Sequence, residues 1–208
     1  MPAARPNDAS SVTLVLGGVR SGKSALAERL ARAADRPALY VATARATDDE
    51  MTERIARHQA SRPTHWRTVE APLDLVVAVK HHAARGDVVV VDCLTVWLGN
   101  RFVEGIGLEA DPELIDAKRW AALESGAVEH AVALCDVARQ RGLRLVLVSN
   151  EVGMGVVPAT SLGRRYRDAL GRVNQAVAAT ADSVLLTVAG LGVDLKALER
   201  ATLAGFAS

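Results

Sequence analysis

Two glycines, a lysine and a serine near the start of the chain have the spacing of a phosphate-binding loop (P-loop). Gly17, Gly22, Lys23 and Ser24 match the pattern G-x-x-x-x-G-K-[ST]. The glycines allow backbone N–H groups to close around phosphate oxygens, because no Cβ stands in the way. The lysine then contacts the β- and γ-phosphates, and the serine hydroxyl is a ligand for Mg²⁺. We therefore expect a nucleoside triphosphate site formed by Gly17, Gly18, Val19, Arg20, Ser21, Gly22, Lys23 and Ser24.

The segments on either side of this loop are those that a P-loop requires. Residues 12–16 form an apolar run typical of a buried strand, and residues 25–31 are rich in strong helix formers. A strand, a tight turn and a helix N-terminus together make an anion site, because the first N–H groups of the helix have no partner within it. A chance match in a glycine-rich turn would lack this context.

A carboxylate at the end of a second apolar run is the next group suited to chemistry. Residues 88–91 are four valines, as in a parallel strand buried on both faces, and Asp92 follows them. A carboxylate in this position is costly unless it serves Mg²⁺ or another partner. We therefore expect Asp92 to bind Mg²⁺ together with Ser24.

A single histidine lies on a helix that we predict over residues 47–59. A capping box of the form T-x-x-E marks the start of this helix. Met51, Ile55 and His58 follow each other at i, i+4 and i+7, so they share one face. From the residues alone, a histidine on an apolar helix face is most simply a core or interface residue.

Strands and helices alternate along the chain. The expected strands cover residues 12–16, 38–43, 68–70, 88–92, 143–149 and 184–189, and the expected helices cover residues 23–34, 47–59, 73–84, 93–102, 112–141 and 161–181, with a possible interruption at Ser125–Gly126. This alternation predicts an α/β fold with a mostly parallel sheet flanked by helices. A length of 208 residues, half of them hydrophobic, suits one domain over residues 11–208, preceded by a tail at 1–10.

Composition excludes several classes of partner. The formal net charge is only +1, from 25 basic and 24 acidic side chains, so no overall field attracts nucleic acid or an anionic membrane. The longest apolar stretch, near residues 184–193, is too short and too interrupted by glycine to span a bilayer. Cys93 and Cys135 lack metal-ligand spacing, and we expect them to be reduced thiols of a cytoplasmic protein.

Several separate segments resemble the bifunctional adenosylcobinamide kinase / adenosylcobinamide-phosphate guanylyltransferase family of cobalamin biosynthesis. They are GGVRSGKS (17–24), YVATA (40–44), DDEMTERIARHQASRPTHWRTVE (48–70), VDCLTVWLGN (91–100), SNEVGMGVVP (149–158) and GRVNQ (171–175). A P-loop alone indicates only that a nucleoside triphosphate is bound, since many enzyme classes share it. Agreement over several segments that span nearly the whole chain is far more specific.

The resemblance implies a RecA-like P-loop fold, often trimeric, and two reactions. Adenosylcobinamide is first phosphorylated on its aminopropanol hydroxyl by GTP or ATP, and GMP is then transferred from GTP to the new phosphate. In the family the second step passes through a guanylylated histidine, and His58 matches it in R-I-x-x-H-x-x-x-R-P. A neutral imidazole is a competent nucleophile at phosphorus near neutral pH. His65 is the competing candidate, and Trp66 beside it either stacks on a base or covers the core.

The resemblance extends to further residues of the nucleotide site, which are Thr43, Ala44, Gln59, Ala60, Ser61, Arg62, Glu70 and Asp92. Arg62 can neutralise triphosphate charge, and Glu70 can accept hydrogen bonds from guanine N1–H and N2–H₂. From the residues alone, an ordinary surface charge is as good an interpretation of Arg62 and of Glu70 as a role in nucleotide binding. Arg57 precedes His58 where some relatives carry a second histidine, so any help from that neighbour in proton transfer is missing here.

Two other classes of function remain as alternatives. A regulatory GTPase would carry a guanine-specificity signature of the N-K-x-D kind, which this chain lacks. A monofunctional small-molecule kinase would share the P-loop but not the covalent histidine step. Among the remaining histidines, His81 and His82 suit a solvated helix end, and His130 has no partner apparent from the sequence.

Overall fold

A seven-stranded sheet forms the centre of the computed structural model, which describes residues 10–45, 49, 52–53, 56, 62–107 and 111–206. In chain order the strands are β1 (Ser11–Gly17), β2 (Ala38–Ala42), β3 (Arg67–Glu70), β4 (Val88–Asp92), β5 (Arg144–Val148), β6 (Ser183–Val188) and β7 (Leu191–Asp194). Their spatial order is β3-β2-β4-β5-β1-β6-β7, and every pair is parallel except β6 with β7. The expected α/β fold with a mostly parallel sheet flanked by helices is therefore confirmed, with one antiparallel edge strand.

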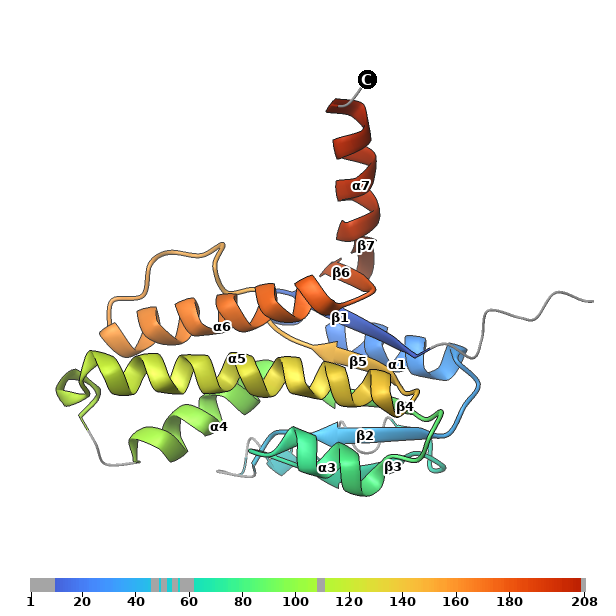
Figure 1. Ribbon diagram of the computed structural model, residues 1–208, viewed down its shortest axis with the longest axis horizontal. Helices are drawn as coiled ribbons and strands as arrows, with labels where there is room; N and C mark the ends of the chain where they lie inside the picture. Colours follow the sequence, from blue (N-terminus) through green and yellow to red (C-terminus); the bar gives the residue numbers. More distant parts are fainter. Residues whose placement is uncertain are drawn as a thin grey trace, which may run out of the picture.

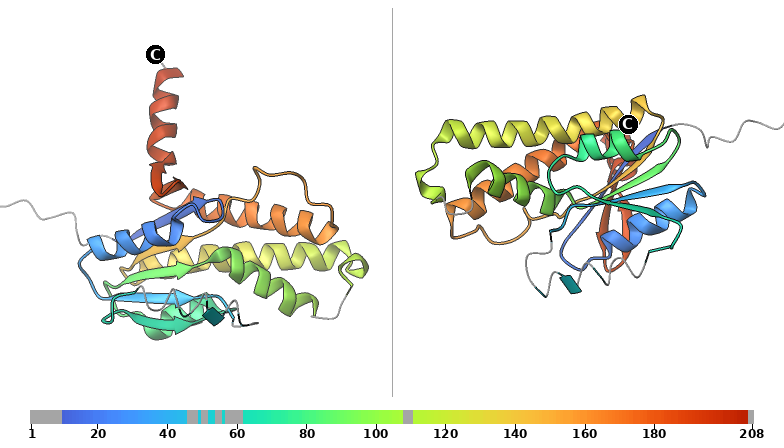
Figure 2. Two further views of the ribbon diagram at one scale, coloured as in Figure 1. Left: turned by 180° about the vertical axis from the view of Figure 1, so that it is seen from behind. Right: turned by 90° about the horizontal axis from the view of Figure 1, so that it is seen from below.

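Helices cover both faces of this sheet (Figures 1 and 2). They are α1 (Lys23–Ala33), α3 (Leu75–His82), α4 (Leu94–Ile106), the short 3₁₀ helix η1 (Pro112–Leu114), α5 (Ala117–Gln140), α6 (Ser161–Thr180) and α7 (Leu195–Phe206). Helix α1 lies on one face, and α5 and α6 lie on the other (Figure 2). None of the helices described is both long enough and apolar enough to cross a membrane.

The valine runs of the sequence are explained by this two-sided burial. In β4, Val89 and Val91 belong to the core beneath α3, α5 and α6, whereas Val88 and Val90 belong to the core beneath α1. Successive side chains of a strand point to opposite faces, so a strand covered on both faces must be apolar throughout. The same alternation places Tyr40 on the α1 face.

Several expected boundaries differ from the structure. Helix α4 continues to Ile106, where we expected a loop from residue 103, and the expected helix 112–141 divides into η1 and α5. Asp116 accepts a hydrogen bond from the backbone N–H of Arg119, so α5 has its own N-cap. The expected interruption at Ser125–Gly126 is wrong, because α5 continues through both residues.

Part of the predicted helix over residues 47–59 lies outside the described residues. The described members, Asp49, Thr52, Glu53 and Ala56, are all helical.

Residues 191–206 were not expected to form a strand and a helix. Strand β7 pairs with β6 and runs against it, with Asp194 opposite Leu185, so the chain returns to the edge of the sheet where the parallel strands begin. Helix α7 starts there and stands away from the rest of the molecule (Figure 1). None of its residues is buried, and Leu198, Leu203 and Phe206 are exposed.

Candidate active site

The P-loop joins β1 to α1, as predicted, and its glycines are required by close packing. A Cβ on Gly17 would lie 2.5 Å from both Ser21 Oγ and the carbonyl oxygen of Thr187. Gly22 has a φ of +97° and is the N-cap of α1, and a Cβ there would lie 2.9 Å from the Cα of Gly190. Only glycine fits both positions without a shift of the backbone.

Lys23 and Ser24 are the first two residues of α1, so they lie at the positive end of an eleven-residue helix. The Lys23 side chain is buried, and its Nζ donates a hydrogen bond to the carbonyl oxygen of Gly18 at 2.6 Å. This contact folds the ammonium back across the loop. The hydroxyl of Ser21 is buried and has no hydrogen-bond partner among the described residues. The loop thus brings together a cation, a helix N-terminus and an unused hydroxyl, which is an arrangement suited to phosphate.

Two neighbouring segments hold the loop in place. The backbone N–H of Glu151, just after β5, donates to the carbonyl oxygen of Gly17 at 3.0 Å. The backbone N–H of Gly190, in the turn between β6 and β7, donates to the carbonyl oxygen of Ser21 at 2.8 Å. Sequence reasoning missed both supports. Glu151 lies in the recognised segment SNEVGMGVVP, but Gly190 had no signal beyond a glycine within an apolar stretch.

The ends of the parallel strands bring the other expected residues to the same edge. The pairing register aligns Glu70 with Ala42, Ala42 with Asp92, Asp92 with Val148, and Val148 with Val15. One strand, β5, separates the P-loop strand from the strand that ends in Asp92. Ligands of open α/β sheets bind at this carboxyl edge. Thr43 and Ala44 follow β2 at the same edge, and Glu70 ends β3 with an exposed side chain.

The side chain of Thr43 is engaged within the protein. Its hydroxyl accepts a hydrogen bond from the backbone N–H of Cys93 at 2.8 Å and donates to the carbonyl oxygen of Cys93 at 2.9 Å. Asn100 donates from its side-chain amide to the carbonyl oxygen of Thr43. Thr43 therefore joins the end of β2 to the segment that follows Asp92.

Asp92 is held by a tyrosine from the neighbouring strand. The Tyr40 hydroxyl donates to Asp92 Oδ2 at 2.7 Å, and no described residue forms a hydrogen bond with Oδ1. Burial, followed by the negative charge of Asp92, raises the pKa of Tyr40 far above its ordinary value, so the hydroxyl keeps its proton.

The donor set of the site fits Mg²⁺. No three His, Cys, Asp or Glu side chains gather into a metal cluster in the described part of the chain. In nucleotide sites Mg²⁺ takes one or two protein ligands and completes its shell with phosphate oxygens and water. One serine hydroxyl and one carboxylate, Ser24 and Asp92, are therefore a sufficient protein contribution.

Arg62 lies against the same tyrosine. Its guanidinium carbon is 3.5 Å from the centroid of the Tyr40 ring, and Nε and Nη1 are buried without a hydrogen-bond partner among the described residues. His58, Gln59, Ala60 and Ser61 lie outside the described residues. His65 is exposed, and Trp66 is buried in the α1-side core, which supports a packing role for its ring.

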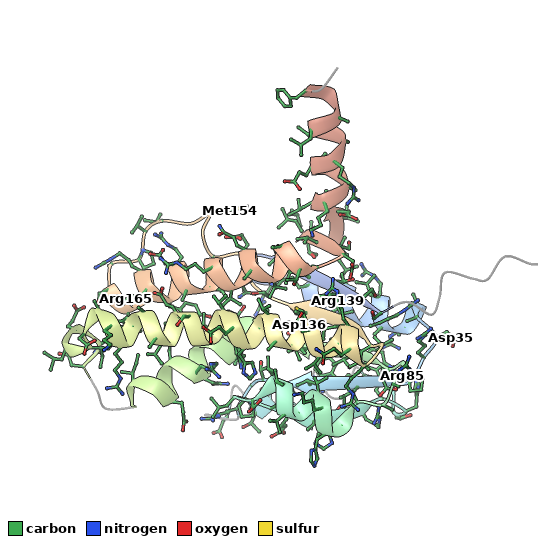
Figure 3. The ribbon with its side chains drawn as sticks, in the orientation of Figure 1. Asp35, Arg85, Asp136, Arg139, Met154 and Arg165 are labelled. Atoms are coloured by element: carbon green, nitrogen blue, oxygen red, sulfur yellow. The ribbon has the colours of Figure 1, made fainter. Side chains whose placement is uncertain are left out.

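An apolar cavity of about 430 Å³ lies between α4 and the first turns of α6. Its lining includes Phe102, Ile106, Leu162 and Tyr166, and the described lining residues carry no charged side chain that would bind a phosphate. The loop that leads from β5 to α6 carries Met154, which is highly exposed and lies on the outer side of the loop (Figure 3).

Comparison with known proteins agrees with this geometry. Residues 13–195 match the family described as cobinamide kinase / cobinamide phosphate guanyltransferase. The chain belongs to this family. Its members combine two activities in one enzyme, a cobinamide kinase and a cobinamide phosphate guanylyltransferase.

The chain matches curated relatives over nearly the full length of each relative. The bifunctional adenosylcobalamin biosynthesis protein CobP of Pseudomonas aeruginosa is 46% identical over 183 residues, which are 88% of this chain and 96% of the relative. The corresponding CobU proteins of Salmonella typhimurium and Escherichia coli are 44% and 40% identical, over 88% of this chain and 98% of each relative. A solved KaiC-like protein from Pyrococcus horikoshii aligns with a TM-score of 0.44 and 14% identity, over 86% of this chain and 71% of that one.

Proposed function

We propose that the protein phosphorylates adenosylcobinamide with a nucleoside triphosphate and then converts the product to adenosylcobinamide-GDP through a guanylylated His58. In the covalent step an imidazole nitrogen of His58 forms a bond to the α-phosphorus of GTP, and pyrophosphate leaves. A phosphate oxygen of adenosylcobinamide phosphate then attacks the same phosphorus, and the P–N bond breaks as the P–O–P bond forms. Two nucleophilic displacements at the α-phosphorus thus replace a single direct transfer of GMP.

The match of His58 to the guanylylated histidine of the family supports this assignment, and a contact made by a nearby residue agrees with it. Arg62 follows His58 by four residues and stacks on Tyr40, whose hydroxyl bonds Asp92 at the carboxyl edge. Four residues span at most about 14 Å even when fully extended. Chain connectivity therefore keeps position 58 within that distance of Arg62, and Arg62 contacts the α1-side core through Tyr40.

For the nucleotide, we propose that Lys23, Arg62 and the N–H groups of residues 17–24 bind the phosphates of GTP, or of ATP in the kinase step. Glu70 accepts from guanine, and its exposed position at the end of β3 leaves the carboxylate free for this role. Thr43, Ala44 and residues 59–61 complete the site. Ser24 and Asp92 hold Mg²⁺, which, when bound, offsets the negative charge of the phosphates.

Intact-mass measurement after incubation with GTP tests the covalent step. The wild type gains the mass of one GMP, and the adduct is stable to base and labile to acid, as expected for a phosphoramidate. His58→Ala gains no mass but still phosphorylates adenosylcobinamide, because phosphoryl transfer needs the P-loop and no covalent histidine. His65→Ala, the matched control, is labelled like the wild type.

Two outcomes would overturn the assignment. An unlabelled wild type that still phosphorylates adenosylcobinamide would be a monofunctional kinase. Full labelling of His58→Ala, together with loss of labelling in His65→Ala, would move the nucleophile to His65.

We also propose that the protein is a cytoplasmic homotrimer. The resemblance to a family that is often trimeric supports the assembly, and two free cysteines, Cys93 and Cys135, fit a reducing compartment. Mass photometry is expected to give about three times the 22.0 kDa of the chain. A mass equal to that of one chain would contradict the trimer.

A further inference from the structure

Tyr40 contacts two groups of the nucleotide site without belonging to any recognised phosphate or metal motif. It lies in the middle of β2, opposite Val90 of β4, and only 2% of its surface is exposed. Asp92 lies two residues beyond Val90 and thus on the same face of the sheet. The tyrosine side chain therefore extends along the α1-side face toward the carboxyl edge.

The contact with Asp92 fixes one carboxylate oxygen and leaves the other available. A hydroxyl that donates to an ionised carboxylate forms one of the stronger hydrogen bonds in proteins. With Oδ2 held by Tyr40 at 2.7 Å, rotation of the carboxylate is restricted. Carboxylates that bind metals are commonly held in this way by a second residue, and loss of that residue typically lowers metal affinity 10–100-fold.

The contact with Arg62 uses the ring and not the hydroxyl. The guanidinium lies over the ring face at 3.5 Å, which is close enough for both stacking and cation–π attraction. Buried N–H groups without partners are unfavourable, and Nε and Nη1 of Arg62 are two such groups among the described residues. An anionic ligand would supply the missing acceptors.

We propose that Tyr40 is a positioning residue that sets the metal-binding carboxylate and the phosphate-binding guanidinium relative to each other, Asp92 through its hydroxyl and Arg62 through its ring. This inference rests on the proposed roles of Asp92 and Arg62 in binding Mg²⁺ and triphosphate. It adds a residue to the site and gives a physical reason why a buried tyrosine occupies the middle of β2, where every other core side chain of the strand is aliphatic.

Two substitutions separate the two contacts. Tyr40→Phe removes the hydroxyl and keeps the ring, whereas Tyr40→Leu removes both. Binding of GTP is measured by calorimetry with EDTA present, which reports on Arg62 without metal. Binding of Mn²⁺ is measured by electron paramagnetic resonance in the complex with α,β-methylene-GTP, which cannot transfer GMP to His58, so the measurement reports on Asp92 without turnover.

We expect Tyr40→Phe to raise the Mn²⁺ dissociation constant about tenfold while the GTP dissociation constant in EDTA changes less than twofold. We expect Tyr40→Leu to raise both constants about tenfold. In an Asp92→Asn background, Tyr40→Phe has no further effect on Mn²⁺ binding, because the two residues act as a unit. If Tyr40→Leu fails to fold, Arg62→Lys tests the ring contact, because lysine keeps the positive charge but cannot stack on the ring as a planar guanidinium does. Arg62→Lys should then weaken GTP binding in EDTA.

The only other tyrosine provides the matched control. Tyr166 is partly buried, and its hydroxyl donates to the carbonyl oxygen of Thr95 at 2.7 Å. Tyr166→Phe therefore removes a similar hydrogen bond away from the carboxylate, and Mn²⁺ binding should stay within twofold of the wild type.

The outcomes distinguish the inference from the function on which it rests. If Asp92→Asn weakens Mn²⁺ binding but Tyr40→Phe does not, or if Tyr166→Phe has the same effect as Tyr40→Phe, the role of Tyr40 is wrong and the site stands. If Asp92→Asn leaves Mn²⁺ binding unchanged, the proposed role of Asp92 is itself wrong.

Discussion

The imidazole Nε2 of His130 accepts a hydrogen bond from the backbone N–H of Leu75 at 3.1 Å, across 55 residues of sequence. Val76 N–H lies 3.4 Å from the same nitrogen, and Asp74 accepts from Val77 N–H. The first N–H groups of α3 thus have an acceptor from α5 as well as their own N-cap. His130 therefore has a partner that was not apparent from the sequence, and Nε2 must be unprotonated to act as acceptor.

His130 makes stability depend on pH. Burial, followed by the positive charge of Arg101, lowers the pKa of His130 below its ordinary value of 6.5, and Asp74 opposes this shift. Well above pH 6.5 the histidine is neutral in both the folded and the unfolded state, and its full contribution to stability is present. As pH falls below 6.5 the unfolded state takes up the proton first, so stability is lost until the pKa of the folded state is passed.

Urea unfolding at pH 7.5 and pH 5.5 measures this effect. His130→Gln keeps an acceptor that does not titrate, so it should lose less stability between the two pH values than the wild type. His130→Ala should cost about 1–2 kcal/mol at pH 7.5, as for loss of a helix cap. Equal pH dependence in the wild type and His130→Gln would contradict this role.

Gly17 should be far less tolerant of a side chain than its neighbour. Gly17→Ala places a Cβ 2.5 Å from a backbone oxygen, whereas a Cβ on Gly18 meets no atom within 4 Å. Without nucleotide, we expect Gly17→Ala to lower the thermal midpoint by about 5–10 °C and Gly18→Ala to change it by no more than about 2 °C. Calorimetry of the two variants side by side checks this, and similar midpoints would show that the loop adapts.

Lys23→Ala should weaken GTP binding about 100-fold and slow both reactions, because the buried ammonium next to the P-loop is lost. Lys80→Ala, on an exposed part of α3, removes the same charge elsewhere and should leave binding unchanged. Equal GTP affinities in the two variants would argue against the P-loop assignment.

Two truncations of the chain should distinguish the role of α7 from the role of β7. A chain that ends at Asp194 lacks α7, which buries no residue and begins where the family match ends. This variant should keep kinase activity, and its thermal midpoint should fall by only a few degrees. A chain that ends at Val188 also loses Gly190 and its hydrogen bond to Ser21, and it should lose nucleotide binding. Loss of activity in the longer variant would give α7 a role in the site.

The parts of the fold that the sequence predicts are those encoded locally. The P-loop and the strand before Asp92 are each specified within a dozen residues, by glycine spacing and by valine runs, and both are confirmed. The interruption predicted at Gly126 is wrong because a glycine within a helix costs only about 1 kcal/mol, which the contacts of α5 offset.

The parts that sequence reasoning missed depend on contacts between distant segments. His130 meets Leu75, and Gly190 meets Ser21, only after the sheet has formed. Tyr40 is likewise one aromatic residue in an apolar strand until the register places it beside Asp92. Periodicity and spacing report on a single segment, so they carry no information about such pairs.

The reversed direction of β7 has a practical consequence. The functional residues lie at the carboxyl ends of the parallel strands. Strand β7 runs in the opposite direction, so the chain is back where the parallel strands begin before α7 starts. An affinity tag, a fluorophore or a surface linker attached after Phe206 would therefore leave the nucleotide edge facing solution. The C-terminus is the natural point at which to immobilise this enzyme for single-molecule or biosensor measurements.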